Sequence, residues 1–188
     1  MNFNIERLEY ANRNPDKHTK KVGRFSATDL YAICTNKITP EAFLNPPKID
    51  SKGSLNCLRG EMVEWAVSRV WERSGAKFDT QRKDVITIDG IEYVAVADFH
   101  FGDKILECKS PEKFTGFKDY NKYQCELQYR IFNVPIYIGY YNLVDGQLTE
   151  QGSYKYEPND KLWQTILTKT KEFNQKLIEY EKRQNKNT

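Results

Sequence analysis

The sequence has no long apolar run, and this absence excludes a membrane-spanning helix. Its longest apolar stretch, residues 134–144, contains Gly139 and Asn142 and is far shorter than the roughly 20 residues that a helix needs to cross a bilayer. The first twenty residues are polar and of mixed charge, without the apolar segment that is typical of a secretory signal peptide. We therefore expect a soluble, cytoplasmic protein that does not associate with a membrane.

Closely spaced cysteine pairs are also absent. The four cysteines, Cys34, Cys57, Cys108 and Cys125, lie far apart, whereas structural zinc sites normally use paired ligands at short spacing. An iron–sulfur cluster assembled from dispersed cysteines is the alternative. We expect four free thiols in a reducing compartment.

The composition is that of one globular domain without a strong charge. The chain has 188 residues, of which 13% are aromatic and 29% charged, so it can bury a core and is unlike a disordered segment. The formal net charge of +3 permits a polyanionic partner but does not require one. We expect residues 1–19 to be loosely ordered, residues 20–184 to form a single domain and residues 185–188 to be a frayed tail.

Hydrophobic periodicity and turn signals predict alternating helices and strands. Helices are expected where apolar residues recur at helical spacing between caps, and strands where β-branched and aromatic residues lie between turns. The predicted helices are 26–34, 54–74, 118–132 and one that begins at Asn159 or Asp160, and the predicted strands are 77–81, 85–88, 91–101, 105–110, 136–143 and 147–156. This order is typical of an α/β fold in which helices flank both faces of a central mixed sheet.

One predicted hairpin places two carboxylates opposite each other. If Gly102-Asp103 is a two-residue turn, Phe101 pairs with Lys104, and Asp98 then falls directly opposite Glu107. Directly opposite residues share a face of the sheet, with Cβ atoms roughly 4.5–5.5 Å apart. Like charges at this separation destabilise the strand pair, so this arrangement needs a compensating positive charge.

Two sources of positive charge are available to this hairpin. Lys109 lies two residues beyond Glu107 and is expected on the same face. A divalent cation is the second source, and an all-oxygen ligand set suits Mg²⁺ or Mn²⁺ better than zinc. The alternative is an ordinary surface hairpin with solvated charges. Against it, Asp98 and Glu107 each end an apolar strand segment, where an uncompensated charge is costly.

The long predicted helix carries a glutamate that we expect to face the protein interior. The helical neighbours of Glu64 are small or apolar, namely Gly60, Val67, Ser68 and Trp71. A glycine inside a helix costs about 1 kcal/mol relative to alanine, but it allows a ligand or another backbone to approach closely. Glu61 is the rival candidate, and we interpret it as a solvated helix charge.

A later helix presents two amides on an otherwise apolar stripe. Gln124 and Gln128 lie one turn apart and need hydrogen-bond partners if they are buried. A network within the core and a functional site would satisfy them equally well, so the pattern leaves both interpretations open.

Taken together, these motifs resemble the PD-(D/E)XK nuclease superfamily, and most closely the branch of lambda exonuclease, YqaJ-type recombinases and RecB-like nucleases. The family has a helical glycine followed four residues later by a glutamate, which Gly60 and Glu64 match. It also has an aspartate after an apolar strand, matched by Asp98, and a Glu-x-Lys on the next strand, matched by Glu107 and Lys109. The resemblance implies a restriction-endonuclease-like core.

Two further elements of the family have counterparts here. The family's downstream helical glutamine is matched best by Gln124, with Gln128 as the other register. Upstream, Lys21, Ser26 and Thr28 fall on an element that in lambda-exonuclease-like proteins helps to hold the 5′-phosphate of DNA. Lys21 stands where the family has arginine, and therefore lacks the bidentate fork of a guanidinium.

The resemblance also implies a chemistry, the hydrolysis of phosphodiester bonds with one or two Mg²⁺ or Mn²⁺ ions. Asp98, Glu107, the Cys108 carbonyl and Glu64 would hold the metal, with Glu64 acting directly or through water. Lys109 would orient the attacking water or stabilise negative charge on the phosphate. Gln124 would position the water or a neighbouring ligand.

From this resemblance we expect a metal-dependent deoxyribonuclease, specifically a 5′-to-3′ exonuclease of DNA recombination, repair or processing, of viral or phage type. Lys113 and Lys118 are further candidates for contacts to DNA phosphates. A homo-oligomer and a recombination or single-strand-binding partner protein are expected from the family. The alternatives are a single-strand or structure-specific endonuclease of the same fold, and a DNA-binding or assembly protein without catalysis.

Overall fold

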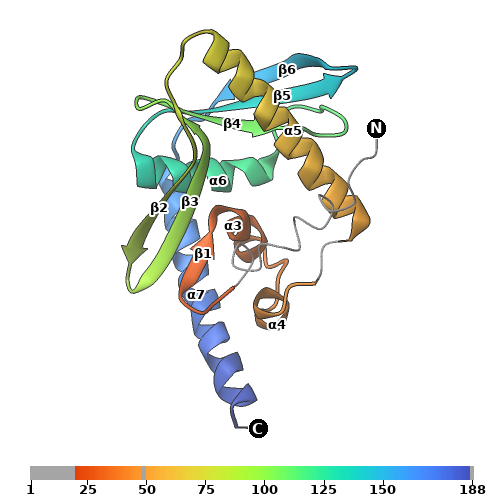
Figure 1. Ribbon diagram of the computed structural model, residues 1–188. Coiled ribbons are helices and arrows are strands. Elements are labelled where there is room, and N and C mark those ends of the chain that lie inside the picture. The colour runs from red at the N-terminus through yellow and green to blue at the C-terminus, as the bar shows by residue number, and fades with distance from the viewer. Residues whose placement is uncertain (1–19, 48–49, 187–188) are drawn as a thin grey trace.

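The computed structural model describes residues 20–47 and 50–186, which form five helices and six strands (Figure 1). The expected N-terminal segment, residues 1–19, lies outside the described residues, as do residues 187 and 188 of the expected tail. The elements are, in chain order, β1 (Arg24–Ser26), α3 (Ala27–Cys34), α4 (Pro40–Leu44), α5 (Ser51–Arg73), β2 (Asp79–Ile88), β3 (Ile91–His100), β4 (Ile105–Lys109), α6 (Asp119–Phe132), β5 (Ile136–Val144), β6 (Gln147–Lys155) and α7 (Asp160–Gln184).

Strand β3 is the centre of the sheet because it pairs with three other strands. β2 runs antiparallel to β3 and fills one edge of it from end to end. The other edge is shared: β1 pairs in parallel with residues 92–94, and β4 pairs antiparallel with Phe99 and His100. β4 continues in parallel with β5, and β5 is antiparallel to β6, so the sheet is mixed.

Helices cover both faces of this sheet. Val63 and Val67 of α5 pack in one apolar cluster with Leu106 of β4, whereas Cys125 of α6 packs in another with Ile105. Successive residues of β4 therefore point to opposite faces, as a strand with two buried faces requires. In Figure 1, α5 crosses the strands on one side and α6 lies on the other.

A third apolar cluster joins the remaining helices to the start of β3. Phe25 of β1, Leu30 of α3 and Phe173 of α7 belong to it, and all are buried. The rings of Phe25 and Phe173 lie 6.2 Å apart, in the range of favourable aromatic pairs. α7 packs on this cluster from Trp163 to Leu177 and then extends away to the C-terminus (Figure 1).

The predicted α/β fold with a central mixed sheet flanked by helices is confirmed. Three details differ. The strands expected at 77–81 and 85–88 are one strand, β2, because its outward residues are exposed and tolerate the polar stretch between them. The helix expected at 54–74 is α5, which begins at Ser51, three residues before the expected start, because the Asp50 side chain caps it by accepting a hydrogen bond from Gly53 N. β1 and α4 were not expected, since both are very short.

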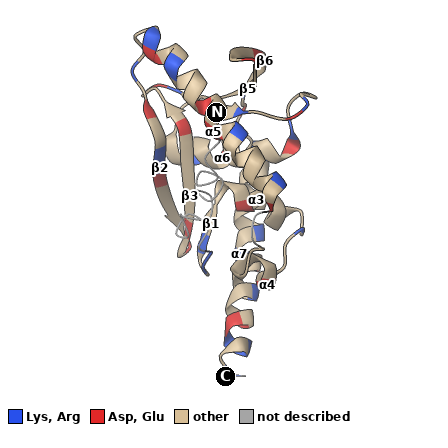
Figure 2. Cartoon of the chain, turned by 45° about the vertical axis from the view of Figure 1, so that its right-hand side comes forward, with Lys and Arg blue, Asp and Glu red and all other residues tan. Residues whose placement is uncertain are grey.

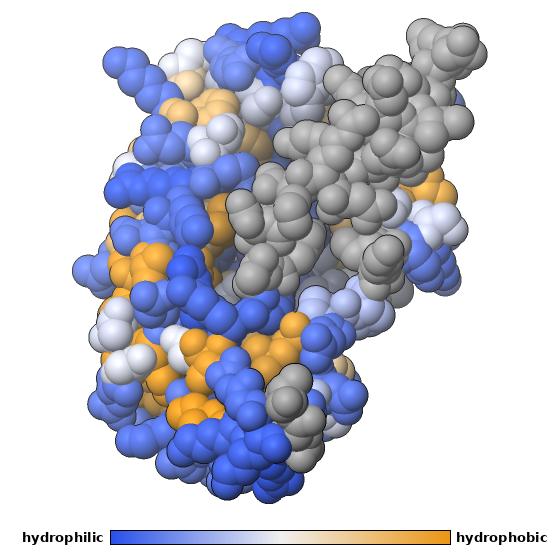
Figure 3. Space-filling view, turned by 60° about the horizontal axis from the view of Figure 1, so that its bottom comes forward, coloured by the Kyte–Doolittle hydropathy of each residue, from blue (hydrophilic) through white to orange (hydrophobic). Residues whose placement is uncertain are grey.

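The surface carries both signs of charge. Lysines, arginines and acidic residues are interspersed along α5, α7 and the β2–β3 hairpin (Figure 2), in keeping with the small net charge. Seen from the end at which α7 leaves, apolar residues reach the surface in patches between hydrophilic ones (Figure 3). Over the described residues, none of the helices combines the length and the apolar character that crossing a bilayer would need.

A buried glutamate fixes α6 to the segment that leads into α7. Glu126 is fully buried and accepts hydrogen bonds from Tyr156 Oη, from Asn159 N at 2.9 Å and from Arg130 Nε at 2.8 Å. Arg130 also reaches Asp160 at 2.6 Å. This network sets the position of the helix that carries Gln124 and Gln128.

We expect Glu126→Ala to lower the free energy of unfolding by about 3–5 kcal/mol, because it leaves buried donors and the Arg130 guanidinium without their partner. Urea denaturation should show a lower midpoint with an unchanged m value. Glu157→Ala is the matched control, since its exposed carboxylate is 3.6 Å from Lys155, and it should change stability little. Equal effects of the two substitutions would contradict the anchoring role of Glu126.

Candidate active site

The two carboxylates of the predicted hairpin lie where β3 and β4 separate. The turn is as expected: Phe101 N donates to Lys104 O at 2.9 Å, and Gly102 has a φ of +90°. The ladder follows the predicted register through His100–Ile105 and Phe99–Leu106, and then stops. Asp98 and Glu107 are thus next in register but are not a ladder pair.

At this fork, side chains replace the missing ladder hydrogen bonds. Asp98 N donates to Glu107 Oε1 at 3.2 Å, and Cys108 N donates to Asp98 Oδ2 at 2.9 Å. On the same edge, Gln128 Nε2 donates to Val96 O at 2.8 Å. The edge of β3 between its pairing with β1 and its pairing with β4 thus obtains hydrogen bonds from side chains of the candidate site, as buried backbone polar groups require.

The apolar side chains of β3 switch from one face of the sheet to the other at Asp98. Ala97 packs in the cluster of Cys125 on the α6 side, whereas Phe99 packs in the cluster of Val63 on the α5 side. A regular strand would place Ala97 and Phe99 on one face. The irregularity lets Asp98 reach toward the α5 side while Glu107 faces α6. The expectation that the two carboxylates share one face of the sheet is therefore wrong, because β3 departs from regular alternation at Asp98.

Glu107 is fully buried and accepts four hydrogen bonds. Besides Asp98 N, its donors are Lys109 Nζ at 3.1 Å and the side-chain amides of Gln124 and Gln128. Burial raises the pKa of Glu107 well above the ordinary carboxyl range, and the charge of Asp98 raises it further, while Lys109 and Gln128 act in the opposite direction. The site thus holds a carboxylate in an environment that disfavours its charge.

Lys109 remains a cation beside this carboxylate. Burial alone would lower its pKa, but the carboxylates of Glu107 and Asp98 outweigh burial and raise the pKa above its ordinary value. Its expected position on the face of Glu107 agrees with their contact.

Both glutamines of α6 contact the site. Gln124 donates to one carboxylate oxygen of Glu107 and Gln128 to the other. Gln128 is fully buried and bonds the β3 backbone as well, whereas Gln124 is only partly buried. Gln128 is therefore part of a core network, and Gln124 lies at its more accessible end, where a functional role stays a prediction.

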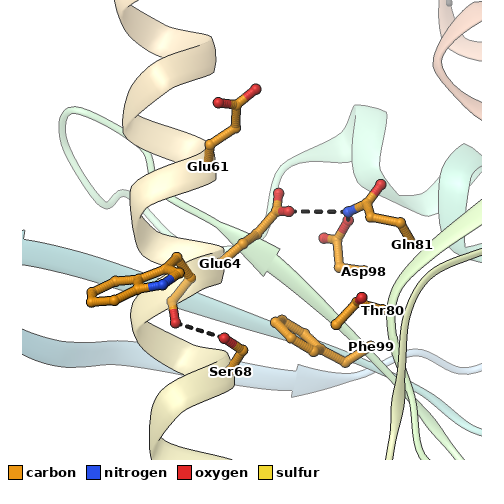
Figure 4. Close-up of a pocket in the computed structure, with 8 residues that line it drawn as sticks. Glu61, Glu64, Ser68, Thr80, Gln81, Asp98 and Phe99 are labelled. Carbon is orange, nitrogen blue, oxygen red and sulfur yellow. Dashed lines mark hydrogen bonds between the residues drawn. The ribbon is translucent and has the colours of Figure 1, made fainter. Parts of the chain in front are cut away.

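Glu64 approaches the site from α5 and meets a residue that the sequence did not single out. Gln81 of β2 donates from Nε2 to Glu64 Oε2 at 3.0 Å and to Asp98 Oδ1 at 3.3 Å. All three line one open pocket (Figure 4). Glu61 also lines it, but in Figure 4 its carboxylate extends away from Asp98, whereas that of Glu64 reaches toward Gln81.

A signal for Gln81 was present in the sequence. The Asp89-Gly90 turn pairs Ile88 with Ile91, and the same register continued down the hairpin brings Gln81 opposite Asp98. The turns of both hairpins of β3 therefore contain the information that places Gln81 and Glu107 near Asp98.

The donor set fits a hard divalent cation in its chemistry. Glu64 and Asp98 offer carboxylate oxygens from two elements, and both converge on one polar nitrogen, that of Gln81. Glu107 lies across the fork, with its oxygens turned to Lys109 and the α6 amides. Within residues 20–47 and 50–186, no three acidic, cysteine or histidine side chains are already gathered into a metal-binding group.

The expected DNA-contact residues near the N-terminus form a cluster with a different lysine. Ser26 caps α3 with Asp29: Ser26 N donates to Asp29 Oδ2 at 2.8 Å, and Ser26 Oγ lies 3.0 Å from Thr28 Oγ1. Lys20, which the sequence did not single out, donates to Asp29 Oδ1 at 2.7 Å and lies 3.4 Å from Ser26 Oγ. Lys21 is exposed in the adjoining turn.

The two other expected DNA-contact lysines lie in the segment that leads into α6. Lys113 is exposed, and Lys118 is the N-cap residue of that helix and donates to Thr115 Oγ1. Their contacts to DNA remain predictions.

The four cysteines do not gather into a metal-binding group among the described residues. All four are free thiols, as expected. Cys108 and Cys125 are buried, and burial raises the pKa of both thiols far above the ordinary range. The placement of the four cysteines does not favour the iron–sulfur alternative.

The fold has solved counterparts, although no protein-family model matches the sequence and no curated protein is similar to it. The crystal structure of SSO0001 is 16% identical, with a TM-score of 0.65 over 89% of this chain and 84% of that chain. An alkaline exonuclease (LHK-Exo) from Laribacter hongkongensis is 21% identical, with a TM-score of 0.63 over 88% of this chain and 95% of that chain. Its complex with dAMP is 22% identical, with a TM-score of 0.62 over the same shares.

These similarities define a class of architecture. The chain has the restriction-endonuclease-like fold that it shares with the alkaline exonuclease. At this level of identity the likeness concerns the fold alone.

We expect Gly60→Ala to raise the free energy of unfolding by about 0.5–1 kcal/mol, because alanine favours the helix and an added Cβ meets no protein atom within 4 Å. The control is Gly152→Ala, whose Cβ would lie 2.8 Å from the Phe114 ring and should lower stability. Thermal unfolding of both variants checks the pair. A loss of stability in Gly60→Ala would show that protein packing, and not a ligand, requires this glycine.

The raised pKa of Glu107 predicts a pH dependence of stability in EDTA-treated protein. Because the folded state binds the proton on Glu107 more tightly than the unfolded state does, the contribution of Glu107 to the free energy of unfolding should rise as the pH falls from about 7.5 to about 5.5. His100, whose pKa is lowered by burial, acts in the opposite direction in this range, and to the same extent in wild type and variant. Below that range the other carboxylates oppose the trend. Urea denaturation across the series should give a flatter slope for Glu107→Gln, which cannot titrate. Identical slopes would mean that Glu107 is ionised throughout.

Proposed function

We propose that this protein is a metal-dependent deoxyribonuclease that hydrolyses DNA phosphodiester bonds. The observation that supports the proposal most is the set of contacts around Glu107, a fully buried carboxylate held by Lys109 and Gln124 beside Asp98. Burying such a group costs stability, and perturbed acids of this kind concentrate at functional sites. The shared fold of an alkaline exonuclease adds support.

The residues that would hold Mg²⁺ or Mn²⁺ are Asp98, Glu107, the Cys108 carbonyl and Glu64. Such a cation, when bound, lowers the pKa of a coordinated water and polarises a phosphate. Lys109 carries a permanent positive charge at the site and would orient the attacking water or stabilise the charge that develops on the phosphate. Gln124, through its bond to Glu107, would keep that carboxylate in position.

Two surfaces of the protein are candidates for contact with DNA. Gly60 leaves open space one turn before Glu64, so a substrate can come close to α5 there. Lys20, Ser26 and Thr28 cluster at the start of α3, and this group would bind a terminal phosphate. On this basis we propose a 5′-to-3′ exonuclease acting in recombination, repair or processing of DNA.

Cleavage of 5′-phosphorylated linear duplex DNA with Mg²⁺ or Mn²⁺, compared with EDTA, tests the proposal. We expect Lys109→Ala and Glu107→Gln each to lower the rate by about 10²-fold or more, since the first removes a positive charge at the reacting phosphate and the second removes a carboxylate that would hold the metal. Glu61→Gln is the matched control on the same pocket and should retain activity, because its side chain extends away from Asp98.

The outcomes separate the alternatives. An exonuclease spares covalently closed circles, whereas a structure-specific or single-strand endonuclease cuts a circle that contains its target. Wild-type rates in both Lys109→Ala and Glu107→Gln would show that the site is elsewhere. DNA binding without any cleavage would show a binding or assembly protein.

A further inference from the structure

Gln81 has a backbone conformation that sets it apart within the sheet. Its φ is +52°, in the left-handed region that residues with a side chain adopt only at a cost. The other described non-glycine residues with positive φ are asparagines or aspartates in turns or at helix ends, which tolerate it: Asn36, Asp89, Asn133 and Asp145. Gln81 alone among them lies inside a strand.

The conformation directs the Gln81 side chain into the candidate site. The β2–β3 ladder includes Thr80–Phe99 and Arg82–Ala97 but omits the pair between them, Gln81 and Asp98. The amide nitrogen of Gln81 lies instead between two carboxylates, 3.0 Å from Glu64 Oε2 and 3.3 Å from Asp98 Oδ1 (Figure 4).

An amide nitrogen at this point serves both carboxylates at once. A glutamine NH₂ group has two hydrogens to donate, one for each acceptor. Glu64 and Asp98 come from different elements, α5 and β3, so this contact links two acidic groups whose charges repel each other. A cation between the same oxygens would do this more strongly.

We propose that the Gln81 amide is a neutral stand-in for the divalent cation, which must displace it to bind between Glu64 and Asp98. The proposal rests on the metal-dependent function above and names the residue that sets the metal affinity of that site. In the metal-free protein the amide offsets carboxylate repulsion. Metal binding then breaks both hydrogen bonds, and the observed affinity is lowered by the strength of the contact that is lost.

Two measurements on the full-length protein test the proposal: Mn²⁺ binding by isothermal titration after EDTA treatment and dialysis, and thermal unfolding with and without Mn²⁺. Gln81→Met keeps the side-chain length but removes the donor, and Gln81→Ala removes the side chain. We expect both variants to bind Mn²⁺ more tightly, by roughly tenfold, since hydrogen bonds to charged groups are lost only from the metal-free state. Their melting temperature in EDTA should fall, and saturating Mn²⁺ should restore most of it.

Two further variants make the test specific. Gln151→Met is the control, since it makes the same exchange at an exposed position of β6, the far strand of the sheet, and should leave Mn²⁺ affinity unchanged. Glu64→Gln removes one of the two carboxylates, so adding Gln81→Met to it should tighten binding by less than in the wild type.

The results that would overturn the proposal differ from one another. Weaker Mn²⁺ binding in Gln81→Met would mean that Gln81 is itself a metal ligand through Oε1. Unchanged affinity in both Gln81 variants would mean that the amide does not compete. If the wild-type protein binds no Mn²⁺ at all, the proposed metal-dependent function fails, and this inference fails with it.

Discussion

The structure around the fork of β3 and β4 depends on one buried carboxylate, that of Glu107. A charge in this position is unfavourable unless donors surround it, and four donors from three elements do so. Those donors constrain the elements that carry them. α6 must present Gln124 and Gln128 toward β4, and the Glu126 network holds the helix in that position.

Much of this arrangement follows from local sequence signals. The Gly102-Asp103 turn fixes the register of the hairpin, and with it the nearness of Asp98 and Glu107. The helical period places Gln124 and Gln128 on one face of α6, where both meet Glu107. These predictions succeeded because each depends on a few neighbouring residues with strong conformational preferences.

What the sequence did not predict depends on distant contacts. β1 is three residues long and exists because it pairs with residues 92–94, far along the chain. Lys20 and Lys21 are adjacent residues of the same type, so the sequence does not distinguish them, and only the tertiary structure shows that Lys20 lies beside Ser26. Two features depart from regular strand geometry: the β3–β4 ladder ends before Asp98, and Gln81 has a left-handed backbone conformation. The alternation of polar and apolar residues along a strand predicts neither of them.

The exchange of ladder hydrogen bonds for carboxylate hydrogen bonds has a consequence for how such proteins evolve. Asp98 and Glu107 each accept a hydrogen bond from the main chain of the facing strand, so replacing either one removes a bond that the sheet itself uses. Selection for folding alone would therefore tend to retain both residues even in a protein of this fold that has no catalytic activity. Lys109, whose contact is to the Glu107 side chain, is the more informative position when inactive relatives are to be told from active ones.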